Sequence, residues 1–333
     1  MYLKLFPELS TMRERRPLYN FISISNKCNA NCIFCDIHEK KETNTNVNIY
    51  KLLFDLKNTG AEYVHFTGGG EPFANKEIFS YMNYATELGL KIVIITNGYF
   101  LTEEVIKKLG KYNIVAMFFS IDSHSGSIHD GIRNVKGIFN RATTAINMIK
   151  KLYPNIKIVI NHVLNNSNID SLCDFIRLKE NVNYDFLNPI IVKECPEYYF
   201  SEEQIKRFND NINYLNTLLK KYNIELLYPN FDYFEVGKYN DDGSDFRKND
   251  IPCRILELCT FIDCVSGNVY PCDCSVHRDS NYYAIGNVLE DSINNIFYSN
   301  KADALRKKLI KCSKCKSKCD YANVYLNKEM KDE

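Results

Sequence analysis

Three closely spaced cysteines are the residues of this 333-residue chain with the clearest capacity for chemistry. Cys28, Cys32 and Cys35 follow an apolar run that begins at Leu18, and their spacing is C-x3-C-x2-C. Thiolates favour iron-sulfur clusters or zinc. Structural zinc takes four protein ligands, and neither a fourth cysteine nor a suitably spaced histidine completes this loop. The loop therefore predicts a metal site with one coordination position open to a substrate or cofactor.

A glycine run and several polar strand ends form a second group of candidate residues. The segment 67–72 reads TGGGEP, and consecutive glycines allow a backbone to approach a ligand closely. Small polar residues also end or interrupt three later apolar runs, and polar groups at strand ends can orient a ligand. These residues are Thr96, Asn97, Ser120, Asp122 and Asn161.

A second set of cysteines lies near the carboxyl end of the sequence. Eight thiols within about 67 residues indicate metal binding; they are Cys253, Cys259, Cys264, Cys272, Cys274, Cys312, Cys315 and Cys319. Tetrahedral zinc is an open alternative, because the C-x2-C pair at Cys312 and Cys315 with a distant cysteine pair would also suit it.

Composition excludes several classes of function. Lys+Arg number 42 against 41 for Asp+Glu, so the net charge of +1 gives no electrostatic reason to expect a nucleic-acid partner. The first residues lack the pattern of a signal peptide, and no run approaches the roughly 18 apolar residues of a membrane span. We therefore expect a cytoplasmic protein in a reducing compartment, where 13 cysteines argue for metal or redox chemistry.

Six apolar runs alternate with helical patterns and must position these residues. Strands are expected at 18–25, 62–66, 91–96, 114–121, 156–163 and 184–191. Helices are expected at 48–57, 77–88 and 201–222. This alternation predicts a parallel sheet with crossover helices, an α/β fold of the partial (β/α)6 barrel type. A change of composition near residue 228 predicts two domains, at 1–228 and 229–333.

The cysteine loop, with an aromatic residue at Phe34, resembles the signature of the radical S-adenosylmethionine (SAM) superfamily. The resemblance implies a 4Fe-4S cluster held by the three thiolates, with SAM on its fourth iron and Phe34 beside the adenine. The glycine run resembles the GGEP motif of the family. Gly69, Gly70 and Glu71 would then meet the amino group of SAM.

The same resemblance extends to the polar strand ends. Thr96, Asn97, Ser120 and Asp122 lie in segments similar to those that line the SAM pocket of the family. Arg133 fits an arginine that pairs with the SAM carboxylate, for which bidentate geometry is suited. Asn161 matches a position near the ribose of SAM.

The segment from Phe261 to Cys272 reads as a hairpin that turns at Gly267, and it resembles the SPASM/Twitch extension of radical SAM enzymes. The resemblance implies one auxiliary 4Fe-4S cluster with ligands from Cys253 or Cys259, Cys272, Cys312 and Cys315, and with Cys319 as a substitute ligand. Two auxiliary clusters stay open, because eight cysteines would suffice for both. Where a full SPASM pattern has its last two cysteines, this chain has Tyr321 and Tyr325.

The resemblance implies an enzyme that receives an electron from a donor such as flavodoxin or ferredoxin and cleaves SAM to a 5'-deoxyadenosyl radical. The radical would take a hydrogen atom from a peptide or protein substrate. Asp273 would be the base in an oxidation, and Cys195 would return a hydrogen atom in an epimerisation. The first alternative is a dehydrogenase of a carbohydrate or aminosugar, and the 27 residues before Cys28 leave no room for the peptide-recognition domain of many peptide-modifying members.

A non-enzymatic alternative is an iron-sulfur electron carrier. Such a carrier would neither bind nor cleave SAM, and it would not need the glycine run or the polar strand ends. Binding and cleavage of SAM therefore discriminate between the two classes.

Overall fold

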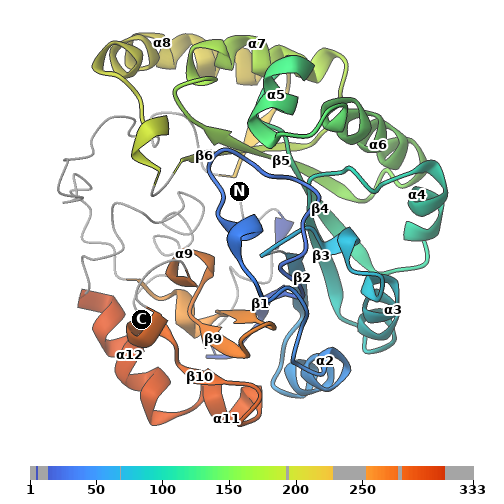
Figure 1. The fold of residues 1–333 in the computed structure, drawn as a ribbon, viewed down its shortest axis with the longest axis vertical. Helices are drawn as coiled ribbons and strands as arrows, with labels where there is room; N and C mark the ends of the chain where they lie inside the picture. The colour runs from blue at the N-terminus through green and yellow to red at the C-terminus, as the bar shows by residue number, and fades with distance from the viewer. Residues whose placement is uncertain are drawn as a thin grey trace.

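The fold is an α/β arrangement around one curved sheet, as predicted. The computed structural model describes residues 5–6, 14–67, 69–192, 195–227, 253–276 and 280–311. Within these ranges, ten strands form a sheet in the order β10-β9-β8-β1-β2-β3-β4-β5-β6-β7. From β1 to β7 each strand pairs in parallel with the next one in the chain. Helices α2, α3, α4, α6, α7 and α8 follow one another around the outside of this sheet, and α5 lies next to α6 (Figure 1).

Seven strands belong to the first part of the chain, and the six predicted ones are confirmed. Their bounds are Tyr19–Ser23 (β1), Tyr63–Thr67 (β2), Lys91–Thr96 (β3), Ile114–Ser120 (β4), Lys157–Leu164 (β5), Phe186–Ile191 (β6) and Glu225–Leu226 (β7). Every residue of β1 and β2 is buried. Parallel strands covered on both faces are typically apolar throughout, which explains why these runs could be recognised from the sequence.

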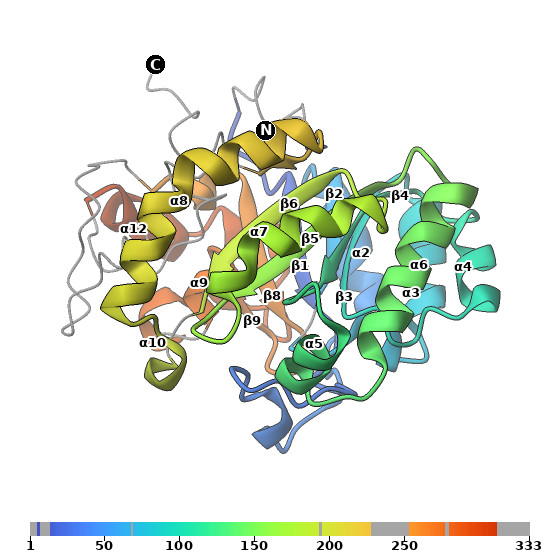
Figure 2. The same cartoon turned by 90° about the horizontal axis from the view of Figure 1, so that it is seen from above.

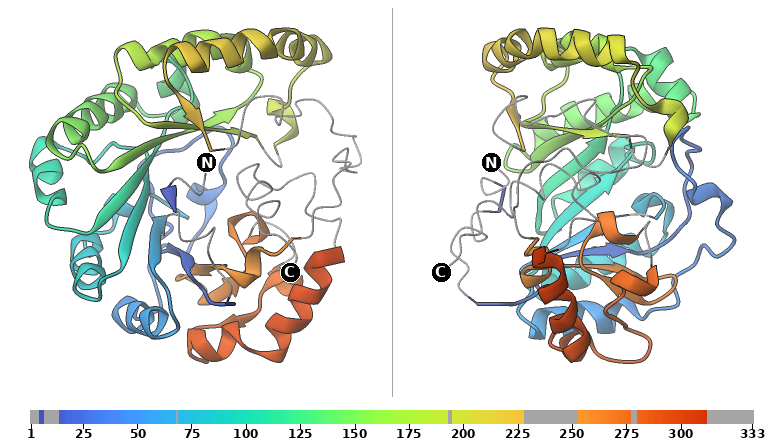
Figure 3. Two further views of the ribbon diagram at one scale, coloured as in Figure 1. Left: turned by 180° about the vertical axis from the view of Figure 1, so that it is seen from behind. Right: turned by 90° about the vertical axis from the view of Figure 1, so that its left-hand side faces the viewer.

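The helices cover the convex side of the sheet (Figure 3). Their bounds are Ile49–Asn58 (α2), Ile78–Glu87 (α3), Glu103–Leu109 (α4), Gly126–Arg133 (α5), Ile138–Leu152 (α6), Leu172–Arg177 (α7) and Glu202–Lys221 (α8). Polar caps fix several of their first turns. Asn48 accepts a hydrogen bond from Lys51 N at the start of α2, and Ser201 forms a reciprocal capping box with Gln204 at the start of α8.

The carboxyl-terminal part continues the same sheet. Its elements are Cys259–Asp263 (β8), Asn268–Tyr270 (β9), Asp273–Val276 (α9), Ser280–Tyr283 (α10), Gly286–Asn287 (β10), Ile293–Phe297 (α11) and Asn300–Lys311 (α12). The predicted hairpin is confirmed, because β8 and β9 pair antiparallel. Gly267 turns between them with φ +81°, a conformation that favours glycine.

The parallel pairing of β8 with β1 could not be read from the sequence. Cys259 lies opposite Tyr19, and Asp263 lies opposite Ser23. Just beyond, the backbone N–H of Asn46 donates to the carbonyl of Cys264 at 2.9 Å. The edge of β1 that β2 leaves free is thus paired with a strand more than 230 residues away in the chain.

Two further sequence-based expectations concern the chain as a whole. The predicted domain boundary near residue 228 lies outside the described residues. No helix in the described ranges is long and apolar enough to cross a membrane.

Candidate functional site

The cysteine loop begins where β1 ends, at the carboxyl edge of the parallel sheet. Cys32 is buried, while Cys28 and Cys35 are half-buried. Burial raises the pKa of the Cys28 thiol to about 11 and also raises the pKa of Cys35. A bound metal ion counteracts this effect because it deprotonates a coordinating thiol. Three sheltered thiols in one short loop therefore fit the donor set of an iron-sulfur cluster.

Helix α5 holds the cysteine loop through backbone contacts. The N–H of Ile33 donates to the carbonyl of Ile132 at 3.0 Å, and the N–H of Asn31 donates to the carbonyl of Arg133 at 3.3 Å. The helix ends at Arg133, where Asn134 adopts a left-handed conformation with φ 53°. These contacts bring the side chain of Arg133 to the loop.

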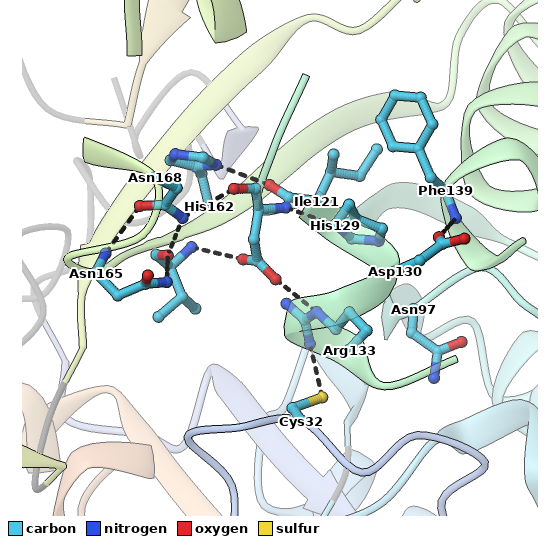
Figure 4. Close-up of polar contacts among 12 residues, drawn as sticks. Cys32, Asn97, Ile121, His129, Asp130, Arg133, Phe139, His162, Asn165 and Asn168 are labelled. Atoms are coloured by element: carbon cyan, nitrogen blue, oxygen red, sulfur yellow. Dashed lines mark hydrogen bonds and ion pairs between the residues drawn. The ribbon is translucent and has the colours of Figure 1, made fainter. Parts of the chain in front are cut away.

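Arg133 lies between a buried carboxylate and a cysteine sulfur (Figure 4). Its Nε donates to Asp122 Oδ2 at 2.6 Å, and its Nη1 lies 3.6 Å from Cys32 Sγ. The guanidinium carbon is 5.4 Å from the centroid of the Phe34 ring. Three residues that the sequence predicted for the SAM site, namely Phe34, Asp122 and Arg133, are therefore in one cluster with Cys32.

Both oxygens of the Asp122 carboxylate accept hydrogen bonds within the protein. Its Oδ1 accepts from the N–H of Val163 at 2.9 Å, its Oδ2 accepts from Arg133, and the residue is 0% exposed. Burial alone would raise the pKa of Asp122, but the charge and hydrogen bond of Arg133 hold it below its usual range. In the structure Asp122 is the partner of Arg133, and a direct contact of Asp122 with SAM stays a prediction.

Two buried histidines and an asparagine pack behind Asp122 (Figure 4). His129 Nδ1 accepts from the N–H of Asp122 at 3.0 Å, and His162 Nδ1 lies 2.9 Å from the carbonyl oxygen of Ile121. Asn168 donates to the carbonyl of Asp122 at 2.8 Å. Burial lowers the pKa of both histidines to about 4, so they are neutral near pH 7. His162 is a core residue with 0% exposure.

The glycine run packs directly against the chain segment that enters the cysteine loop. Gly70 N donates to the carbonyl of Ser25, and Glu71 N donates to the carbonyl of Lys27, both at 2.8 Å. A Cβ on Gly70 would lie 2.0 Å from the carbonyl oxygen of Lys27, and a Cβ on Gly69 would lie 2.0 Å from Asn26 Oδ1. The glycines therefore allow two backbone segments to meet, which brings Glu71 next to the cysteine loop.

Glu71 is buried, and both of its oxygens accept hydrogen bonds. Thr96 Oγ1 donates to Oε1 at 2.7 Å, and the N–H of Asn97 donates to Oε2 at 2.7 Å. Asn97 in turn donates to Asn29 Oδ1 at 2.9 Å, within the cysteine loop. Burial raises the pKa of Glu71 to about 7 against the opposing effect of its hydrogen bonds. Asn29 was not identified from the sequence, because nothing local distinguishes it.

Polar side chains also form a row across three neighbouring strands. The register places Ser120 opposite Asn161, and Asn161 opposite Asn188. Asn188 Nδ2 donates to Asn161 Oδ1 at 2.9 Å. Asn188 was missed because it lies inside the apolar strand β6, where its alignment with Asn161 appears only once the register is known.

Two cysteines of the extension, Cys259 and Cys272, lie toward the amino end of β8. Cys259 and Cys272 are buried, and Cys253 is half-buried against the core. Asp273 begins the short helix α9 directly after Cys272. The predicted ligands Cys312, Cys315 and Cys319 lie outside the described residues.

Cys195 lies near the cysteine loop although it is far away in sequence. Its Sγ is 3.6 Å from the carbonyl oxygen of Phe34, the residue before Cys35. Within the described ranges, no three Cys, His, Asp or Glu side chains are close enough together to hold a single metal ion. Direct contacts thus join Cys32, Phe34, Asp122, Arg133 and Cys195, while Glu71, Thr96 and Asn97 form an adjoining group.

Comparison with known proteins gives the class of this protein. A model of the radical SAM superfamily matches residues 22–178, and a model of the SPASM iron-sulfur cluster-binding domain matches residues 253–320. The first match contains the cysteine loop, Glu71 and Arg133, and the second contains the hairpin. The chain belongs to the radical SAM superfamily and carries a carboxyl-terminal SPASM domain.

Curated relatives differ in the reactions that their names describe. The AdoMet-dependent heme synthase of Methanosarcina barkeri is 30% identical over 131 residues, which are 37% of this chain and 36% of that protein. The mycofactocin maturase of Mycolicibacterium smegmatis is 28% identical over 155 residues, 45% of this chain and 38% of the maturase. The chain thus spans less than half the length of these relatives.

A solved structure shares the fold across nearly the whole chain. The crystal structure of Streptococcus suis SuiB bound to the precursor peptide SuiA has a TM-score of 0.67 and 18% identity, and the match covers 96% of this chain and 74% of SuiB. At that identity the likeness shows a common fold.

Proposed function

We propose that this protein reductively cleaves SAM and abstracts a hydrogen atom from a peptide or protein substrate. The observation that carries the proposal is the junction of the cysteine loop, the Glu71 segment and helix α5 at the carboxyl edge of the sheet. In parallel α/β folds, strand ends at this edge carry the chemistry. An electron carrier has no need of a carboxylate and a guanidinium held at such a junction.

The thiols of Cys28, Cys32 and Cys35 would hold the 4Fe-4S cluster and leave one iron open. When bound and reduced, the cluster supplies an electron to SAM, and the resulting 5'-deoxyadenosyl radical takes a hydrogen atom from the substrate. Phe34 lies between Cys32 and Cys35, where its ring can pack on the adenine of SAM. The surrounding side chains bind and orient SAM.

Glu71 would accept a hydrogen bond from the amino group of SAM, with Gly69 and Gly70 keeping its segment close to the loop. Thr96 and Asn97 already donate to the Glu71 carboxylate and therefore fix its orientation. The free polar atoms of Ser120 and of the Asn161–Asn188 pair would meet the sugar of SAM or the substrate. Arg133 has Nε bound to Asp122, so its remaining N–H groups would serve the SAM carboxylate and Cys32.

The SPASM domain would hold an auxiliary 4Fe-4S cluster through Cys272, with Cys253 or Cys259 and the cysteines at 312, 315 and 319. Cys259 is level with Tyr19, four residues before the end of β1. At about 3.3 Å per residue, Cys259 is about 13 Å along the strand direction from the end of β1, which leads into the cysteine loop. Substrate would lie between them, with Asp273 available as a base.

Two outcomes are open for the substrate radical. In an oxidation, Asp273 would accept the proton that the substrate radical loses, and an auxiliary cluster held by the SPASM cysteines would supply the electron acceptor. Transfer of a hydrogen atom from the Cys195 thiol gives an epimer, after which the sulfur needs an electron and a proton from the external donor. The position of Cys195 beside Phe34 supports the second outcome.

The peptide substrate class is supported by a relative whose name describes a peptide, the PqqA peptide cyclase of Bradyrhizobium diazoefficiens, which is 23% identical over 175 residues. The heme synthase favours a second candidate, a tetrapyrrole substrate, because it is 30% identical in the matched region. A carbohydrate or aminosugar stays as the remaining alternative.

The first test is anaerobic reconstitution followed by addition of dithionite and SAM, with iron per chain and 5'-deoxyadenosine as readouts. We expect about eight irons for one SAM cluster plus one auxiliary cluster, with formation of 5'-deoxyadenosine. About twelve irons would instead indicate two auxiliary clusters. Intact SAM and bound zinc would refute the proposal.

A second test addresses the substrate. Deuterated peptides, deuterated coproporphyrin and deuterated aminosugars are supplied separately, and the deuterium content of 5'-deoxyadenosine is measured by mass spectrometry. Transfer of deuterium only from peptides is the expected result. Transfer only from the porphyrin or only from the sugar would replace the proposed substrate class.

A further inference from the structure

The buried Arg133 contacts a cysteine sulfur, that of Cys32, in addition to its carboxylate partner. The side chain of Arg133 is 10% exposed and that of Asp122 is 0% exposed, so water screens this ion pair only weakly. Nη1 points from the pair toward Cys32 Sγ at 3.6 Å, a distance suited to an N–H donor and the large sulfur atom. The positive charge is thus held against one ligand of the predicted cluster.

The loop and the arginine are fixed to one another by more than this contact. Backbone hydrogen bonds join Asn31 to Arg133 and Ile33 to Ile132, on either side of Cys32. Asp122 is anchored on its other oxygen by the N–H of Val163. The guanidinium therefore cannot turn away from the sulfur without breaking a buried ion pair.

We propose that Arg133 is a positioning residue that raises the reduction potential of the cluster held by Cys28, Cys32 and Cys35, and that Asp122 limits this effect. The inference rests on the proposed function, because it presupposes that the loop binds a cluster. Reduction adds one electron and no bond changes, so the reduced cluster is the more negative form. Hydrogen bonds to ligand sulfurs and nearby charge are among the factors that set such potentials.

The two partners act with opposite signs, which gives the proposal its test. Removal of the positive charge of Arg133 disfavours the reduced cluster and lowers the midpoint potential. Removal of the negative charge of Asp122 leaves the guanidinium less compensated and raises the potential. A purely structural role for the ion pair would not produce opposite shifts.

The experiment is a redox titration of the reconstituted holoenzyme without SAM, followed by electron paramagnetic resonance. The signal of the relevant cluster is the one that disappears in Cys32→Ala. We expect a lower midpoint potential in Arg133→Gln and a higher one in Asp122→Asn.

Arg141→Gln is the matched control, since this arginine also packs on an aromatic ring, at 4.3 Å from the centroid of Tyr99. We expect its potential to equal that of the wild type. Equal potentials in Arg133→Gln and Arg141→Gln, or shifts of the same sign in Arg133→Gln and Asp122→Asn, would overturn the inference. If Arg133→Gln does not fold, the Asp122→Asn shift decides: an increase supports the inference, and no change or a decrease refutes it.

Failure of the inference is distinct from failure of the proposed function. A protein that binds iron and cleaves SAM with unchanged potentials in the variants retains the proposed function and loses the inference. A protein that never forms the cluster loses both.

Discussion

The two groups of cysteines in this protein are organised in different ways. Cys28, Cys32 and Cys35 lie within eight residues of one loop, next to the carboxyl end of β1. The cysteines of the extension are spread over about 67 residues, and Cys259 is level with the opposite, amino end of β1. The first site is thus a local motif supported by its neighbours, whereas the second is assembled from distant segments.

This difference in organisation predicts different effects of substitutions in the two groups of cysteines. The loop is held by backbone hydrogen bonds to α5, and the segment that enters it is bonded to the glycine run. The extension is joined to the sheet by β8, which pairs with β1 although the two strands are far apart in the sequence. We therefore expect substitutions in the loop to abolish chemistry, and substitutions in the extension to alter its outcome.

The largest expected effect separates the two groups directly. Cys32→Ala should lose about four irons per chain and all formation of 5'-deoxyadenosine, because one of only three protein ligands is missing. Cys272→Ala should also lose about four irons but should still cleave SAM. Iron analysis and chromatography of 5'-deoxyadenosine measure both results, with Cys173→Ala on α7 as a control. Loss of SAM cleavage in both variants would break the comparison.

The next effect tests the support of the loop by the glycine run. In Gly70→Ala the new Cβ would lie 2.0 Å from the carbonyl oxygen of Lys27, so the backbone must move. We expect the free energy of unfolding to fall by at least about 2 kcal/mol, measured by urea denaturation of the apoprotein. Unchanged stability would show that the two segments are not in close contact.

Glu71→Gln tests whether the buried carboxylate stabilises the protein and binds SAM. An amide NH₂ in place of one oxygen faces a backbone or hydroxyl donor, and an unsatisfied buried donor destabilises by about 1–3 kcal/mol. The KM for SAM should rise as well. Urea denaturation and SAM-dependent kinetics provide the two measurements, and wild-type values for both would contradict the assignment.

The pH dependence of stability gives an independent check on Glu71. Its pKa is about 7 in the folded protein and 4.5 as a reference, so the folded state holds the extra proton between these values. The stability contributed by this protonation is present below about pH 4.5 and is lost as the pH rises to about 7. The unfolding free energy of the wild type should therefore fall by on the order of 3 kcal/mol more than that of Glu71→Gln across this window. Parallel pH profiles would contradict the burial of the carboxylate.

The smallest expected effect is a stabilisation. Gly131 lies inside α5, and a Cβ added there would meet no atom within 4 Å. Gly131→Ala should raise the unfolding free energy by about 0.5–1 kcal/mol, because alanine favours the helix. Gly131→Ala is also the matched control for Gly70→Ala, and its stability is measured by the same urea denaturation. A loss of stability in Gly131→Ala would mean that α5 packs differently.

Features with a local signal were predictable from the sequence. The apolar strands, the spacing of Cys28 to Cys35 and the turn at Gly267 each depend on neighbouring residues, and they are where they were expected. Asn188 gave no such signal, because its partner Asn161 is on another strand and only the register brings them together.

Features that depend on distant contacts were not predictable. Nothing in the segment around Cys259 indicates that it pairs with β1, and nothing around Arg133 indicates that Asp122 occupies its Nε. The SAM-pocket segments were anticipated by resemblance, but the burial of Asp122 follows from tertiary packing. Figure 2 shows α5 at the edge of the sheet, where it packs against α6.

The most direct test of the central claim is whether SAM occupies the open position of the cluster held by Cys28, Cys32 and Cys35. The electron paramagnetic resonance spectrum of the reduced holoenzyme is recorded with and without SAM at low temperature, before cleavage proceeds. We predict a changed spectrum for the signal that is missing in Cys32→Ala. An identical spectrum with and without SAM, together with intact SAM after warming, would contradict the account and indicate an electron carrier.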